Sequence, residues 1–156
     1  MANLIRIWIE TTHNAAFRSG GWAYVLAEGS ALSGAAGGER TGSPERIALA
    51  GLTEALKGAP VGMAVEVLSS IPLVRGAPQR MAGAGEPPSE DLELWAQLTT
   101  ALKGRSARFE AAANAPRTPT AFATAWAELA RDKAKSAGAF RAAIPKVNLA
   151  KAGVPA

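Results

Sequence analysis

The stretch SPERIALAGLTEALKG, residues 43–58, contains both the start and the stop signal of a helix. Ser43 is a favoured N-cap, Pro44 suits the first helical turn, and Gly58 suits the end of a helix. Apolar side chains recur between them at a spacing that places them roughly on one helical face: Ile47, Leu49, Leu52 and Leu56. The stretch therefore predicts an amphipathic helix that packs on a core.

Segments typical of strands lie on both sides of this helix. Before it come 4–10 (LIRIWIE), 22–29 (WAYVLAEG) and a weak third strand within 30–40, with a loop predicted at 11–21. The short links predict an antiparallel meander. After it, the apolar run 61–70 (VGMAVEVLSS) predicts a buried strand, and this strand–helix–strand order predicts a parallel crossover.

The second half of the chain predicts further helices and one more strand. A short helix near residues 71–78 is limited by prolines, a helix capped by Ser89 is expected over 89–103, a strand over 106–113, and a last helix over 119–136. The order predicts an α/β domain, residues 1–138, with a five-stranded mixed sheet flanked by helices. Residues 139–156 form a basic and apolar tail, which we expect to dock because Pro145 interrupts a long helix.

Composition limits the class of protein. The chain has 156 residues, of which 48% are hydrophobic and 19% charged, as expected for one globular domain. It has no cysteine, which excludes disulfides and thiolate metal sites and fits a reducing cytosol. No signal peptide and no membrane span are predicted, so the expected location is cytoplasmic and no membrane partner is expected.

The charge is distributed unevenly. The net charge is +4, but residues 103–151 contain ten lysine or arginine residues and only three acidic residues. Two interpretations stay open for this basic third: a solvated face, or a surface that meets phosphate or an acidic partner.

Four strings of the sequence resemble the ribonuclease H family (type 1), over roughly residues 4–135. GGWAYVL is similar to a glycine-rich strand of that family, ERIALAGLTEAL and DLELWAQLTTAL to two of its helices, and WAELAR to a segment of its last helix. The resemblance implies the ribonuclease H fold. It also implies the activity of that family, which cuts the RNA strand of RNA–DNA hybrids with two magnesium ions held by four acidic positions.

The resemblance also places those four positions on this chain. Glu10 retains a carboxylate, but Ala48, Ser69 and Ala127 stand where the family has acids. Two magnesium ions need several anionic oxygens, so Glu10 is interpreted as vestigial and no metal site is predicted.

Other family features are missing as well. The carboxylates near these positions, Glu45, Glu66 and Glu128, do not substitute for the lost acids in register. The segment NAPRTPT has no histidine where the family has one, and the segment at the family's basic protrusion contains only Arg80.

The sequence thus predicts a non-catalytic ribonuclease H-like domain that serves as a scaffold or interaction module, with residual nucleic-acid binding as part of that hypothesis. The alternative is an active, metal-dependent ribonuclease H. No cofactor is expected under the first hypothesis, and Mg²⁺ is expected only if the alternative holds. The expected partner is a protein or a nucleic acid such as an RNA–DNA hybrid. The candidate nucleic-acid-binding residues are Thr11, Thr12, Asn14, Arg46 and Arg117.

Aromatic residues and the single histidine have less specific interpretations. Trp22, Trp95 and Trp126 could stack on bases, but their apolar surroundings in sequence favour core positions. His13, the only histidine, is expected to be solvated in a loop.

Overall fold

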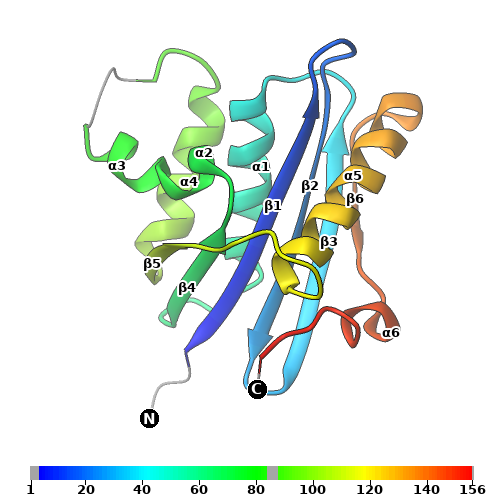
Figure 1. The fold of residues 1–156 in the computed structure, drawn as a ribbon. Coiled ribbons are helices and arrows are strands. Elements are labelled where there is room, and N and C mark those ends of the chain that lie inside the picture. The colour runs from blue at the N-terminus through cyan, green and yellow to red at the C-terminus, as the bar shows by residue number, and fades with distance from the viewer. Residues whose placement is uncertain (1–3, 84–87, 156) are drawn as a thin grey trace.

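A computed structural model describes residues 4–83 and 88–155. One mixed sheet has the strand order β5-β4-β1-β2-β3-β6, and helices cover both of its faces (Figure 1). The mixed α/β class is as predicted, but the sheet has six strands and not five. Among the described residues, none of the helices combines the length and the hydropathy needed to cross a membrane.

The first three strands form the predicted antiparallel meander: β1 is Ile5–Asn14, β2 is Ser19–Glu28 and β3 is Ala31–Glu39. The strand β1 is longer than predicted, because residues 11–14 continue pairing with β2 up to Asn14 opposite Ser19. The strand β4, Ala64–Ser69, pairs parallel to β1, and β5, Ser106–Ala111, pairs parallel to β4. The crossover through the first helix is therefore confirmed.

The sixth strand corrects the predicted sheet. The strand β6, Phe140–Ala143, pairs antiparallel with β3 and covers an edge that would otherwise expose unpaired backbone groups. The close approach depends on small residues: a Cβ at Gly37 would come within 2.5 Å of the Phe140 carbonyl oxygen. Four residues with two alanines have no alternating pattern, so the sequence carried little signal for this strand.

The helices are α1 (Pro44–Lys57), α2 (Pro72–Arg75), α3 (Ala77–Met81), α4 (Leu92–Lys103), α5 (Pro119–Ala137) and α6 (Lys146–Leu149). The helix α1 begins as predicted, with the Ser43 hydroxyl accepting a hydrogen bond from the Arg46 amide at 3.1 Å. The helix α4 does not begin as predicted. Its N-cap is Asp91, in a left-handed conformation, and not Ser89, and no side-chain hydrogen bond caps it. The segment compared with the basic protrusion includes residues 84–87, which lie outside the described residues.

Two apolar clusters lie on the two faces of the sheet. Along β1, Ile5, Ile7 and Ile9 belong to the cluster with α1 and α4, whereas Trp8 belongs to the cluster with α5. Because strand side chains alternate between faces, Glu10 shares the face of Trp8. The last residues complete this second cluster, with Ile144, Leu149 and Ala152 buried.

The predicted core tryptophans lie where the apolar pattern suggested. Trp22 and Trp95 are buried in the first cluster, and Trp126 packs half-buried against the second.

Candidate functional site

Glu10 lies near the middle of β1, next to the end of β4, and its side chain is 1% exposed. Three groups at the end of β4 donate to its carboxylate. Ser69 Oγ lies 3.1 Å and the Ser70 amide nitrogen 2.8 Å from Oε2, and the Ser70 hydroxyl contacts Oε1. Both carboxylate oxygens are therefore occupied by neutral donors from the protein itself.

The helix α5 adds a further hydroxyl to this cluster. Thr124 Oγ1 lies 3.3 Å from Glu10 Oε1 and 2.9 Å from the Thr120 carbonyl oxygen, so its one proton is shared between two acceptors. Asn114 donates to the same hydroxyl at 3.2 Å. We call Glu10, Ser69, Ser70 and Thr124 the Glu10 cluster.

Ala127 lies one helical turn beyond Thr124 and does not contact Glu10 in the hydrogen-bond network. It is fully buried, and its carbonyl oxygen accepts a hydrogen bond from Thr12 Oγ1 at 3.2 Å. The residue of α5 that reaches Glu10 is therefore Thr124, three positions before the residue that the WAELAR string suggested.

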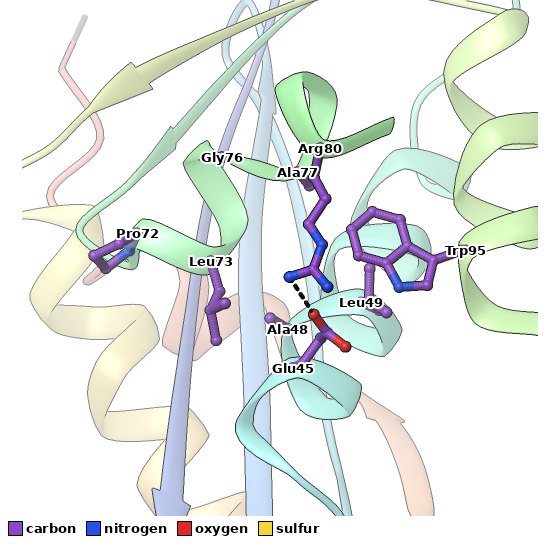
Figure 2. Close-up of a pocket in the computed structure, with 9 residues that line it drawn as sticks. All are labelled: Glu45, Ala48, Leu49, Pro72, Leu73, Gly76, Ala77, Arg80 and Trp95. Atoms are coloured by element: carbon purple, nitrogen blue, oxygen red, sulfur yellow. Dashed lines mark ion pairs between the residues drawn. The ribbon is translucent and has the colours of Figure 1, made fainter. Parts of the chain in front are cut away.

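Ala48 lies on α1 at the wall of an apolar pocket of about 160 Å³ (Figure 2). Pro72 and Leu73 of α2 and Trp95 of α4 line the same pocket. Its polar group is an ion pair between Glu45 and Arg80 at 3.0 Å, visible in Figure 2. A methyl group at Ala48 supplies no ligand here, and the neighbouring carboxylate of Glu45 is already paired.

Comparisons with known proteins place this geometry in a fold family. The sequence matches no protein-family model and no curated protein. The structure is similar to the N-terminal RNase H domain of a Mycobacterium tuberculosis protein, with a TM-score of 0.64 and 20% identity over 85% of this chain and 96% of that one. It is also similar to RNase H1 of the archaeon Halobacterium salinarum, with a TM-score of 0.60 and 18% identity over 83% and 98% of the two chains.

A third similar structure is LC11-RNase H1 in complex with an RNA/DNA hybrid, with a TM-score of 0.63 and 21% identity over 85% of this chain and 99% of that one. This chain has a ribonuclease H-like fold. At these identities the likeness establishes the fold, and the chemistry has to be argued from the side chains.

The residues of this ribonuclease H-like domain do not fit a pair of magnesium ions. Among residues 4–83 and 88–155, no three histidine, aspartate or glutamate side chains come together as a metal-ligand group. Glu10 is the one carboxylate of the Glu10 cluster, and hydroxyl and amide donors already occupy its oxygens. Hard divalent cations prefer several anionic oxygens, which this cluster does not supply.

Arg46, a predicted phosphate contact, is held by acidic side chains instead. Its guanidinium lies 2.6 Å from Glu39, 3.1 Å from Asp91 and 3.2 Å from Glu93. These partners, the hydrogen bond to Glu39 most of all, raise the pKa of Arg46 above its already high value. A phosphate would have to compete with three carboxylates for this side chain.

The other predicted nucleic-acid-binding residues are dispersed. Asn14 Oδ1 accepts hydrogen bonds from the amides of Ala16 and Phe17 at 3.0 and 3.3 Å, and so shapes the β1–β2 turn. Thr11 and Thr12 are half-buried in β1. Arg117 is exposed before α5, where its carbonyl oxygen packs against Gly153 near the C-terminus, so the structure does not bring it to Arg46.

His13 was predicted to be solvated in a loop, and this is wrong. It lies in β1, half-buried, with Nε2 2.7 Å from the Gly42 carbonyl oxygen. Because a carbonyl only accepts, Nε2 carries the proton in this contact. His13 therefore ties the end of β1 to the segment before α1.

Ser70, Thr124 and Asn114 are the members of the site that the sequence interpretation missed. Their signal was present but weak: SS directly follows a buried strand, and threonines recur at the start of the last helix.

Proposed function

We propose that this chain is a non-catalytic ribonuclease H-like module that serves as an interaction scaffold and retains nucleic-acid binding. The observation that carries the proposal is the Glu10 cluster. Its one carboxylate is buried and accepts hydrogen bonds from Ser69 and Ser70. Phosphodiester cleavage with two metal ions would instead need several free anionic oxygens.

The hydroxyls explain how the cluster remains folded without metal. A buried carboxylate is costly unless its oxygens are hydrogen-bonded. Serine and threonine donors satisfy Glu10 without adding charge, so the cluster needs no cation to offset repulsion between neighbouring acids. It acts as a polar link between β1, the end of β4 and α5.

Nucleic-acid binding is supported by the fold and by the charge of the second half of the chain. LC11-RNase H1 has this fold and was solved with an RNA/DNA hybrid. Residues 103–151 of this chain carry ten basic and three acidic residues, a balance that attracts polyanions.

Calorimetric titration with Mg²⁺ and Mn²⁺ tests the proposal without depending on activity. We expect no saturable binding by the unmodified protein. Saturable Mg²⁺ binding that disappears in Glu10→Gln would overturn the proposal.

A matched pair of variants serves as positive control for the geometry. The quadruple variant Glu10→Asp, Ala48→Glu, Ser69→Asp and Thr124→Asp should gain metal binding, because Thr124 faces Glu10. The same variant with Ala127→Asp in place of Thr124→Asp should gain less, because Ala127 lies one turn away.

A further inference from the structure

Three segments bring cations together at one end of the molecule. The β1–β2 turn carries Arg18, Arg40 follows the end of β3, and Lys135 lies in the last turn of α5. Figure 1 shows that the β1–β2 hairpin and the end of α5 lie at the same end of the sheet. With Phe17, these residues form what we call the hairpin patch.

Direct contacts hold the hairpin patch together. Arg40 Nε donates to the Lys135 carbonyl oxygen at 3.3 Å, and Lys135 Nζ lies 3.5 Å from the centroid of the Phe17 ring. The Arg18 carbonyl oxygen accepts from the Gly42 amide at 2.8 Å, which fixes the turn to the segment before α1. The patch is thus formed by tertiary structure, from residues up to 118 positions apart in sequence.

The positive charge of the hairpin patch is not neutralised by ion pairs. Within the part of the chain that the structure describes, none of its three cations lies in an ion pair, and all three are exposed. The acidic residues nearest in sequence to Arg40 and Lys135 have other partners: Glu39 pairs with Arg46 at 2.6 Å and Asp132 with Arg131 at 3.2 Å. The end of α5 contributes roughly half a negative charge, which offsets only part of three positive ones.

Phe17 adds an exposed aromatic ring to this charge. Its side chain is 57% exposed at the tip of the hairpin, so part of the ring is open to solvent. Lys135 contacts the ring, and Arg18 follows it in the chain. An exposed aromatic ring flanked by cations is the arrangement with which proteins stack an unpaired base and contact its phosphates.

We propose that the hairpin patch binds single-stranded nucleic acid, with a base stacked on Phe17 and phosphates contacted by Arg18, Arg40 and Lys135. This deepens the proposed function and rests on its nucleic-acid binding, for which it names a surface and a single-stranded ligand, but it does not need the Glu10 cluster. Glu10 and Asn14 are four residues apart on β1, about 13 Å along the strand, so the patch is a separate surface.

Fluorescence anisotropy with labelled dT12 and rU12, measured over a salt series, tests this proposal. Three phosphate contacts predict a slope of log K against log[salt] of about −2. Arg40→Gln should weaken binding and reduce that slope by about 0.7, whereas Phe17→Ala should weaken binding about tenfold and leave the slope unchanged.

A control variant carries the same charge change at the other end of the sheet. Lys57→Gln lies at the end of α1, near the start of β4, and should leave affinity and slope unchanged. Thermal unfolding of each variant checks that the fold persists.

Three results would overturn the proposal: no binding of either oligomer at 50 mM salt, equal losses in the patch and control variants, or full affinity in Phe17→Ala. Binding of anionic vesicles or polyglutamate as tightly as dT12 would also overturn it, since it would reveal an unselective polyanion surface. Hybrid cleavage or metal binding would contradict the proposed function alone, so the two failures are distinguishable.

Discussion

At the scale of single residues, Glu10 shows how a carboxylate persists in the core of this domain. It is 1% exposed, and Ser69, Ser70 and Thr124 surround it with hydroxyls. Removing donors from a buried charged acceptor costs more than the average hydrogen bond contributes, because the acceptor is left without water as well.

The double variant Ser69→Ala and Ser70→Ala should therefore lower the free energy of unfolding by about 1–3 kcal/mol. Urea denaturation monitored by tryptophan fluorescence measures the change. Ser33→Ala, at an exposed serine of β3, is the control and should be close to neutral. A double variant as stable as the parent would show that the hydroxyls are dispensable for holding Glu10.

The ionisation of Tyr24 gives a second prediction at the scale of single residues. Burial raises its pKa above the usual value, and Arg141 opposes this effect in part. Above the unfolded pKa of about 10, the unfolded phenol loses its proton while the folded phenol keeps it. The folded state then binds more protons, so the free energy of unfolding falls as pH rises through this range.

Tyr24 is the only tyrosine, so absorbance at 295 nm reports its ionisation directly. The titration midpoint should lie above 10 in the folded protein and return to about 10 in denaturant. Tyr24→Phe should remove the corresponding part of the loss of stability at alkaline pH. A native midpoint at or below 10 would contradict the burial argument.

At the scale of elements, the close approach of α5 to the sheet depends on glycine in β2. A Cβ at Gly21 would lie 2.1 Å from the Ala127 carbonyl oxygen and 2.5 Å from the Arg131 amide nitrogen. Both obstacles are helix backbone, which cannot rotate away as a side chain can. The helix α5, which carries Thr124, can therefore lie this close to the sheet only because Gly21 of β2 has no Cβ.

Gly21→Ala should destabilise the domain by about 1–3 kcal/mol or more, because α5 has to shift to admit the methyl group. Gly42→Ala is the matched control, since its Cβ would meet its neighbours no closer than 3.4 Å. Thermal denaturation compares the two variants. Equal melting temperatures would show that α5 adapts without cost.

The elements that the sequence predicted well are those with their own local signals. The helix α1 has Ser43, Pro44 and an apolar face, and the structure reproduces its start. The strand β6 and the cap of α4 at Asp91 were not predicted, because the first depends on pairing with β3 and the second on a left-handed backbone turn. The pairing of β6 with β3 is a tertiary contact, which a local sequence pattern does not contain.

At the scale of the whole molecule, the tertiary structure, and not the position in the sequence, decides which charged side chains lie together. Arg46 lies in the first turn of α1, but carboxylates from β3 and from the start of α4 pair with it. Arg18 and Lys135 are distant in sequence and lie together at the hairpin end. The neutral side chains at Ala48 and Ser69 could be read from the sequence, whereas the hydroxyls that surround Glu10 required the structure.

Cleavage of an RNA–DNA hybrid is the measurement that tests the central claim most directly. A labelled hybrid is incubated with the unmodified protein in Mg²⁺ and, separately, in Mn²⁺, with Glu10→Gln as the control variant. We predict no product above that of a blank without protein, because among residues 4–83 and 88–155 no three acidic or histidine side chains come together that could hold a metal pair. Metal-dependent cleavage by the unmodified protein that Glu10→Gln abolishes would contradict the account.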